Sequence, residues 1–161
     1  MRAPDVFAAA RYLKTLPQID GRRIATIGYS HGGWTLRWAV ATEAQYPEVD
    51  LRPFIMFYPT WTGWKALLGT TPVLMLLGDK DDWTPAAPCE ALSRAASCAG
   101  RTVTALLYPE AYHHFDGAEV RRRTSVLDAR GGLGVTIEYN PRAHEDAEKQ
   151  LRAFLAANLK P

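Results

Sequence analysis

Short apolar runs alternate along the chain with longer amphipathic segments, and this alternation predicts the order of the structural elements. Four runs are apolar almost without interruption, which is typical of strands covered on both faces of a parallel sheet. These predicted strands cover residues 23–28, 53–58, 73–77 and 103–108. Because amphipathic segments lie between and around them, we expect an α/β fold with a mainly parallel sheet and helices on both of its faces.

The amphipathic segments repeat apolar residues at intervals of three or four positions, which indicates α-helices. They cover residues 5–15, about 31–45, about 86–99 and about 143–158. The sequence therefore opens with a helix, and no predicted strand precedes the one at 23–28. We expect residues 23–28 to form an edge through which two copies of the chain associate, since an unpaired strand edge readily pairs with another strand.

The composition is that of one soluble globular domain spanning residues 1–161. Hydrophobic residues make up 47% and charged residues 22%, and the formal net charge is only +2. So small a charge gives no reason to expect nucleic acid or a membrane surface as a partner, and no apolar stretch is long enough to cross a bilayer. The one basic cluster, Arg121 to Arg123, is interpreted as a solvated face.

The two cysteines do not predict a disulfide framework. Cys89 and Cys98 fall on the same predicted helix, nine residues apart. That spacing places them on opposite faces of the helix and too far apart to bridge. We expect two buried free thiols.

The segment Gly28-Tyr29-Ser30-His31-Gly32 is a G-x-S-x-G pattern between a predicted strand and a predicted helix. In that context a sharp strand-to-helix turn holds the serine hydroxyl out at the carboxyl edge of the sheet. We predict that Ser30 is a nucleophile and that the backbone N–H of His31, at the start of the helix, is an oxyanion donor. A glycine-rich turn whose serine only caps the helix is the structural alternative.

A serine nucleophile needs a base, and the base needs a carboxylate that orients it. The predicted strand at 73–77 runs into a loop that contains Asp79, Asp81 and Asp82. A carboxylate just past a strand end lies on the same edge of a parallel sheet as Ser30. Helix capping or exposure to solvent would account for Asp79 and Asp82, and the loop alone leaves all three as candidates.

The candidate bases follow the last predicted strand. His113 and His114 are adjacent, so their side chains cannot both point into one site. His144 is interpreted as a surface residue. The histidines and acids do not have the spacing of zinc ligands, so we expect no metal site.

Three ordered motifs together resemble those of the dienelactone hydrolase family, a branch of the α/β hydrolases. Residues 27–33 resemble the family's nucleophile elbow, residues 78–85 resemble its acid loop, and residues 108–116 resemble its histidine loop. The resemblance runs from about residue 5 to the end and implies Asp81 as the acid and His113 as the base. It implies the three-layer α/β/α sandwich of an α/β hydrolase.

Two departures change what the resemblance implies. Dienelactone hydrolase itself has a cysteine nucleophile where this chain has Ser30, so we expect an esterase-like relative. Family members also carry several strands before the helix that opens this sequence, and the loop after one of them supplies a second oxyanion N–H. We therefore expect the C-terminal part of a domain whose N-terminal strands are missing here. The absence of a signal-peptide pattern slightly favours a cytoplasmic location, although a signal peptide could lie in the missing part.

The combined expectation is a serine hydrolase with a Ser30–Asp81–His113 triad that cleaves carboxylic esters or lactones through an acyl-enzyme and needs no cofactor. An acyl-peptide or prolyl-type serine peptidase and a truncated, inactive pseudoenzyme or binding subunit are the alternatives. Aromatic residues near the site are candidates for an acyl pocket, although ordinary packing explains them equally well. The pocket candidates are Tyr29, Trp34 and Trp83, with Trp61 and Trp64 nearby in the expected site.

Overall fold

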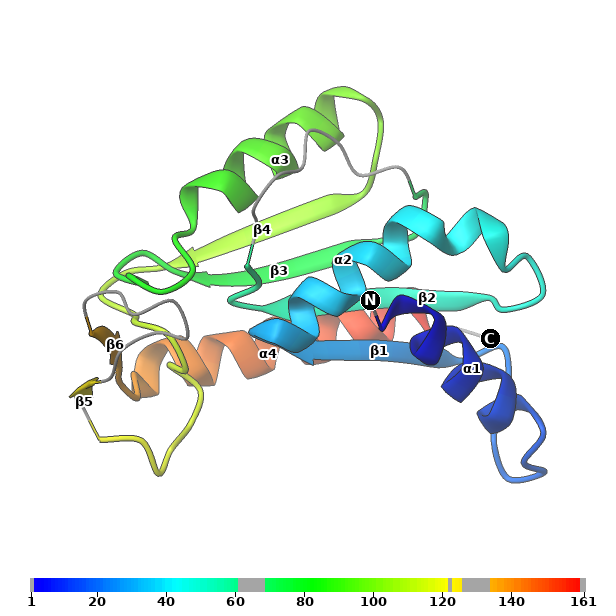
Figure 1. Cartoon of the computed structure of the whole chain (residues 1–161), viewed down its shortest axis with the longest axis horizontal. Helices are drawn as coiled ribbons and strands as arrows, with labels where there is room; N and C mark the ends of the chain where they lie inside the picture. Colours follow the sequence, from blue (N-terminus) through cyan, green and yellow to red (C-terminus); the bar gives the residue numbers. More distant parts are fainter. Residues whose placement is uncertain (1, 61–68, 122, 126–133, 160–161) are drawn as a thin grey trace.

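The computed structural model describes residues 2–60, 69–121, 123–125 and 134–159 of the chain. Its centre is a sheet of four parallel strands in the order β1-β2-β3-β4 (Figure 1). These strands are β1 (Ile24–Tyr29), β2 (Leu51–Phe57), β3 (Val73–Gly78) and β4 (Val103–Tyr108). The expected α/β fold with a parallel sheet is confirmed, and each strand boundary lies within about two residues of its predicted position.

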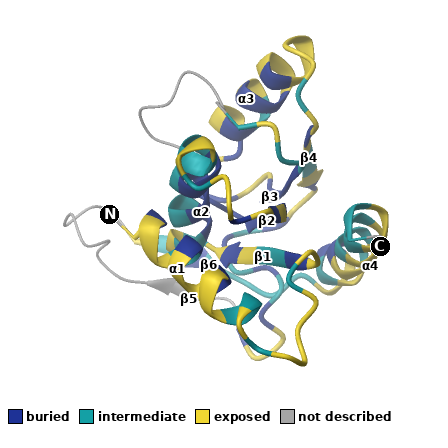
Figure 2. Cartoon of the chain, turned by 90° about the vertical axis from the view of Figure 1, so that its right-hand side faces the viewer, coloured by how far each residue is buried: buried dark blue, intermediate teal, exposed yellow. Residues whose placement is uncertain are grey.

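Helices cover both faces of this sheet. They are α1 (Ala3–Lys14), α2 (His31–Thr42), α3 (Ala87–Cys98) and α4 (Pro141–Asn158), and the short 3₁₀ helix η1 (Glu43–Gln45) continues α2. The helices α1, α2 and α3 lie on one face and α4 lies on the other, as Figures 1 and 2 show. The three layers are therefore those of an α/β/α sandwich.

The alternation of side chains along β2 builds one core on each face of the sheet. Phe54 and Met56 point into the core beneath α1, α2 and α3. Their neighbours Ile55 and Phe57 point into the second core, where α4 contributes Ala147. Because both faces are covered, residues 53–57 of β2 are apolar without alternation. Each large apolar side chain among them contributes about 1.5–3 kcal/mol by leaving water.

The start of α4 has a side-chain cap. The Asn140 Oδ1 atom accepts a hydrogen bond from the backbone N–H of Ala143 at 3.1 Å, and Pro141 occupies the first helical position. Asparagine and proline are favoured at these two positions because they satisfy or remove unpaired backbone N–H groups. The helix consequently begins two residues before the predicted start at residue 143.

The expectation of two buried thiols is wrong for one of them. Cys89 is buried and Cys98 is exposed, and neither is in a disulfide. Only one face of α3 packs on the sheet, so residues on opposite faces of this helix cannot both be buried.

Beyond the main sheet, β5 (Arg123–Ser125) and β6 (Val135–Ile137) pair in an antiparallel hairpin that the sequence pattern did not predict. Both strands have three residues, too few to show a period of two. Within the described ranges, the chain contains no helix with the length and apolar character needed to cross a membrane.

Among the described residues, nothing pairs with the outer sides of β1 and β4, which are the two edges of the main sheet. An apolar side chain is exposed on each, with Ile27 of β1 at 43% and Leu107 of β4 at 42%. The predicted edge strand is therefore present in the described part of the chain.

Candidate active site

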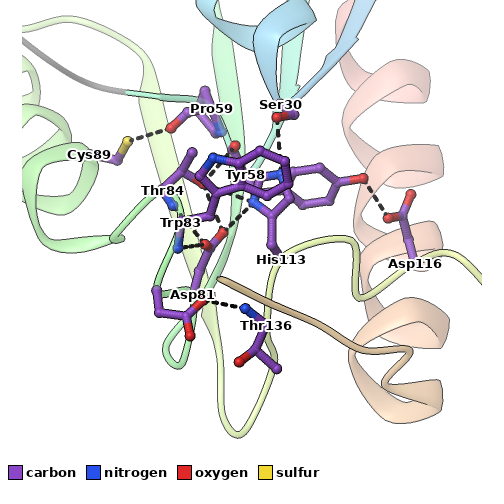
Figure 3. A network of polar contacts seen from close by, with 11 residues as sticks. Ser30, Tyr58, Pro59, Asp81, Trp83, Thr84, Cys89, His113, Asp116 and Thr136 are labelled. Carbon is purple, nitrogen blue, oxygen red and sulfur yellow. Dashed lines mark hydrogen bonds and ion pairs between the residues drawn. The ribbon is translucent and has the colours of Figure 1, made fainter. Parts of the chain in front are cut away.

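The carboxyl ends of the parallel strands bring three loops to one edge of the sheet. Ser30 follows β1, the loop with Asp81 follows β3, and the loop with His113 follows β4. Parallel strands end at the same edge, which is where ligands bind in open α/β sheets. This edge is shown in Figure 3.

Ser30 occupies a tight turn between β1 and α2. Its φ of 50° and ψ of −113° are rarely adopted by a residue with a side chain. The turn is closed by a 2.9 Å hydrogen bond from the Ser30 N–H to the carbonyl oxygen of Phe57. Gly28 permits the close approach, because a Cβ atom there would lie 2.6 Å from the carbonyl carbon of Gly32.

His113 joins the serine to the acid loop. Its Nε2 atom lies 3.0 Å from Ser30 Oγ, and its Nδ1 atom lies 2.8 Å from Asp81 Oδ2 (Figure 3). The histidine is 3% exposed and the aspartate 5% exposed, so their contact is shielded from water, whereas the contact with Ser30 is partly buried. The backbone of His113 is held from the side of β6, since its carbonyl oxygen accepts a 3.3 Å hydrogen bond from the N–H of Glu138.

Asp81 is held by its own loop. Its Oδ1 atom accepts hydrogen bonds from the backbone N–H groups of Trp83 at 2.9 Å and of Thr84 at 2.7 Å. Its Oδ2 atom lies 2.8 Å from the Thr84 hydroxyl and 2.8 Å from His113 Nδ1. Since these contacts fix both oxygens, the carboxylate has one orientation toward the imidazole.

The other two aspartates of the loop are exposed and face elsewhere. Asp82 accepts a 2.8 Å hydrogen bond from the backbone N–H of Thr136, which ties the acid loop to β6. The backbone N–H of Asp79 donates to the carbonyl oxygen of Tyr108 at 3.1 Å. Of the three candidate acids, the structure brings Asp81 to the histidine.

The remaining histidines lie outside the Ser30–His113–Asp81 contacts. His114 is half-buried with a φ of 62°, and its ring centroid lies 6.2 Å from that of Tyr58. His144 is half-buried on α4 and its Nδ1 atom lies 3.3 Å from the Tyr139 hydroxyl, so it is less exposed than predicted. The described residues include no group of three or more histidine, cysteine or acidic side chains that could hold a metal ion.

Tyr58 and Thr84 also lie at the site. Tyr58 is outside the three motifs, and Thr84 is within the acid loop at 78–85, where the sequence suggested no role for it. The Tyr58 ring lies 4.5 Å from the His113 ring, and its hydroxyl donates a 2.8 Å hydrogen bond to Asp116. Burial, with the nearby Asp116 carboxylate, raises the pKa of the Tyr58 hydroxyl. Tyr58 directly follows β2, so its position at the end of a strand is the feature of the sequence that could have indicated it.

The predicted pocket residues surround this edge at different places. Trp83 is 46% exposed with its ring 4.8 Å from that of His113, and Tyr29 is 47% exposed with its ring stacked 4.7 Å from that of Phe57. Burial raises the pKa of the Tyr29 hydroxyl, and the Asp116 charge adds to this. Trp34 is half-buried on α2, where its ring stacks on the His31 ring at 5.2 Å.

Two further sequence predictions fall wholly or partly outside what the structure describes. Trp61 and Trp64 lie outside the described residues. In the basic cluster, Arg121 is exposed, as expected of a solvated face, and Arg122 lies outside the described residues.

Solved structures that match this chain share its fold. A protein of Klebsiella pneumoniae subsp. pneumoniae MGH 78578, provisionally assigned as a dienelactone hydrolase, is 22% identical with a TM-score of 0.70, over 96% of this chain and 60% of that one. The carboxylesterase Cest-2923 from Lactobacillus plantarum WCFS1 is 15% identical with a TM-score of 0.67, over 94% of this chain and 66% of that one. Dipeptidyl peptidase 4 of Porphyromonas gingivalis is 17% identical with a TM-score of 0.70, over 98% of this chain and 23% of that one.

With the parallel sheet and its helical layers, these likenesses define an α/β-hydrolase fold. Within that class the chain belongs to the dienelactone hydrolase family, whose model matches residues 2–159. No curated protein matches the chain. The chain spans about three fifths of the length of the Klebsiella protein.

Proposed function

We propose that this chain carries the catalytic residues of a serine hydrolase that cleaves carboxylic esters or lactones through an acyl-enzyme. The observation that carries the proposal is the double contact of His113, at 3.0 Å from Ser30 Oγ and 2.8 Å from Asp81 Oδ2. Nucleophile, base and orienting acid need this arrangement, with each pair within hydrogen-bond reach. The family membership agrees with it, because the family is one of hydrolases.

In the proposed mechanism, Ser30 Oγ attacks the carbonyl carbon of the ester while His113 Nε2 takes the hydroxyl proton. Asp81 keeps the imidazole oriented and stabilises the imidazolium that forms. The imidazolium then gives its proton to the leaving alcohol as the acyl-enzyme forms. A water that His113 activates finally attacks the acyl-enzyme, which releases the acid and restores the serine.

The strained turn at Ser30 supports its role as a nucleophile. A φ of 50° and a ψ of −113° are those of a residue held by its surroundings, here by β1, by α2 and by the hydrogen bond to Phe57. We infer that this turn is the nucleophile elbow of the fold and that the N–H of His31, at the first position of α2, is an oxyanion donor.

A second oxyanion donor would come from outside the three loops described above. Loss of one such donor lowers turnover by about 10²–10³ in a well-studied serine protease. We therefore expect slow turnover from this chain by itself, even with an activated serine.

A serine peptidase is the second candidate, since the fold is shared with a dipeptidyl peptidase. Esters and amides separate the two functions because amide cleavage demands protonation of a poorer leaving group. We expect hydrolysis of short p-nitrophenyl esters and none of the matching peptide p-nitroanilides, with ester hydrolysis lost in Ser30→Ala. Cleavage of the anilides would favour the peptidase, and equal ester hydrolysis by Ser30→Ala would contradict both candidates.

The acyl group would lie against exposed aromatic surface at this edge. Tyr29 and Trp83 are about half exposed there, at 47% and 46%. Aromatic side chains of this kind favour apolar acyl chains and aryl groups. We infer a small-molecule ester with an apolar acyl group as the substrate class.

A further inference from the structure

Thr84 is a buried residue at which three elements of the site meet. It lies on the loop after β3 and is 6% exposed. Its Oγ1 atom lies 2.8 Å from Asp81 Oδ2, 3.0 Å from the main-chain oxygen of Tyr58 and 3.1 Å from His113 Nδ1 (Figure 3). One hydroxyl therefore contacts the proposed acid, the proposed base and the end of β2.

The chemistry of these neighbours determines which of them can accept the hydrogen of the Thr84 hydroxyl. A threonine hydroxyl has one proton to donate, whereas a carbonyl oxygen and a carboxylate oxygen can only accept. The proton therefore goes to Tyr58 or to Asp81. The lone pairs of Oγ1 then face His113 Nδ1, and lone pairs are a favourable neighbour for this nitrogen only when it carries a hydrogen.

Tyr58 contacts both Thr84 and His113 and so restricts the movement of both side chains. Its φ of 37° is in the left-handed region. Its carbonyl oxygen lies 3.0 Å from Thr84 Oγ1, and its ring lies 4.5 Å from the His113 ring. Among the described residues, the groups that face His113 are the Asp81 carboxyl group from the loop after β3, the Ser30 hydroxyl from the turn after β1 and the Tyr58 ring from the end of β2.

We propose that Thr84 is a positioning residue that, with Asp81, holds His113 in the tautomer with hydrogen on Nδ1. The Nε2 atom, 3.0 Å from Ser30 Oγ, is then left with a free lone pair. A general base must be in this state to take the serine proton. The catalytic consequence rests on the proposed function, whereas the tautomer of His113 does not.

The test compares Thr84→Val, which keeps the shape of the side chain, with Thr84→Ser, which keeps the hydroxyl. Long-range ¹⁵N–¹H NMR spectra of the full chain at about pH 8, where an ordinary histidine is neutral, report the tautomer of His113. We expect the Nδ1–H tautomer alone in the unmodified chain and in Thr84→Ser, and a mixture of both tautomers in Thr84→Val. The rate of fluorophosphonate labelling should fall about tenfold in Thr84→Val and by less than about twofold in Thr84→Ser, as expected for one hydrogen bond to a charged group.

A further pair of variants guards against a folding defect in Thr84→Val. Thr84→Ala and Thr84→Ser both lack the methyl group and differ only in the hydroxyl, so their comparison isolates it even if the valine variant does not fold. Circular dichroism confirms which variants are folded. An unchanged tautomer and an unchanged labelling rate in folded Thr84→Val or Thr84→Ala would overturn the proposal.

Failure of the proposed function would look different. If the unmodified chain is not labelled at all, the serine hydrolase proposal is contradicted. A change of tautomer on removal of the hydroxyl would even then support the positioning role, and an unchanged tautomer would overturn it.

Discussion

At the scale of single residues, the turn at Ser30 depends on backbone atoms that touch. A Cβ atom at Gly28 would overlap the first turn of α2, because it would lie 2.6 Å from both the carbonyl carbon and the carbonyl oxygen of Gly32. Gly32 itself faces open space, since a Cβ atom there would meet nothing within 4 Å. Of these two glycines in the same motif, Gly28 has no room for a side chain and Gly32 has room for one.

Alanine substitution of the two glycines should separate these constraints. We expect Gly28→Ala to lower the free energy of unfolding by about 1–3 kcal/mol, because the added methyl group must displace backbone. Gly32→Ala should be neutral or stabilising by up to about 1 kcal/mol, since alanine is the better helix former. Urea unfolding measures both, and similar effects of the two variants would show that the close approach at Gly28 does not constrain the turn.

Tyr58 makes the stability of the fold depend on pH in the alkaline range. Burial beside Asp116 raises the pKa of its hydroxyl in the folded chain. Below about pH 10 the tyrosine keeps its proton in both the folded and the unfolded chain, so its contribution is fully present there. As the pH rises further, the unfolded chain releases the proton while the folded chain retains it, and the contribution is lost.

The variant Tyr58→Phe should remove this part of the pH dependence. The slope of the unfolding free energy against pH, measured by urea unfolding above about pH 10, should be shallower by up to about 1.4 kcal/mol per pH unit. Tyr12→Phe is the matched control, because Tyr12 is 65% exposed. A slope that the two variants change equally would contradict the assignment to Tyr58.

The residues of the site differ in how far the sequence could predict them. Ser30, Asp81 and His113 stand in ordered motifs, and the structure brings their side chains within hydrogen-bond distance, while their catalytic roles remain a proposal. Tyr58 lies outside these motifs, and Thr84 lies within the acid loop at 78–85 without a role that the motif assigns. Their contacts depend on where the ends of β2 and β3 lie relative to the histidine loop, and no local pattern records that distance.

At the scale of elements, apolar runs predicted the four strands of the main sheet. The runs reflect burial on both faces for the central strands β2 and β3, whereas the edge strands β1 and β4 are apolar but partly exposed. The hairpin of β5 and β6 gave no such signal, since three-residue strands are too short for a periodic pattern. Its position depends on contacts with distant residues, among them the hydrogen bond from the Thr136 N–H to Asp82. A sequence pattern cannot report a contact between segments 54 residues apart.

Helix α3 presents its two cysteines to different surroundings. Cys89 is buried against the sheet, where burial raises the pKa of its thiol to about 12, and Cys98 is exposed near the end of the helix. A buried thiol that keeps its proton reacts slowly, because the thiolate is the reactive form.

Thiol titration should therefore count one cysteine in the folded chain and two in the unfolded chain. We expect Ellman's reagent to modify Cys98 promptly and Cys89 only in strong denaturant, and Cys98→Ser to abolish the prompt reaction. Prompt reaction of the Cys98→Ser variant would contradict the packing of α3 on the sheet.

At the scale of the whole molecule, the sheet of the described residues has two open edges and the chain spans about three fifths of the length of the Klebsiella protein. An unpaired strand edge readily pairs with a strand of another chain. We propose that the edge at β1, next to Ser30, is the one that pairs.

Substitution of one exposed side chain on each edge tests this choice. Ile27 of β1 and Leu107 of β4 have almost the same exposure, 43% and 42%. We expect Ile27→Lys to convert an associated form into a monomer in sedimentation velocity, because a charge on an edge strand blocks pairing. Leu107→Lys should leave the association unchanged. A monomer at all concentrations for the unmodified chain would contradict association through this edge.

The most direct test of the proposed function is covalent labelling of the purified chain with a fluorophosphonate, read by intact mass. The contacts of Ser30 with His113 and of His113 with Asp81 predict one label per chain, because a serine beside such a base is activated. Labelling should be lost in Ser30→Ala and retained in Ser97→Ala, which removes an exposed serine from α3. Absence of labelling, or equal labelling of Ser30→Ala, would contradict an activated serine at this site.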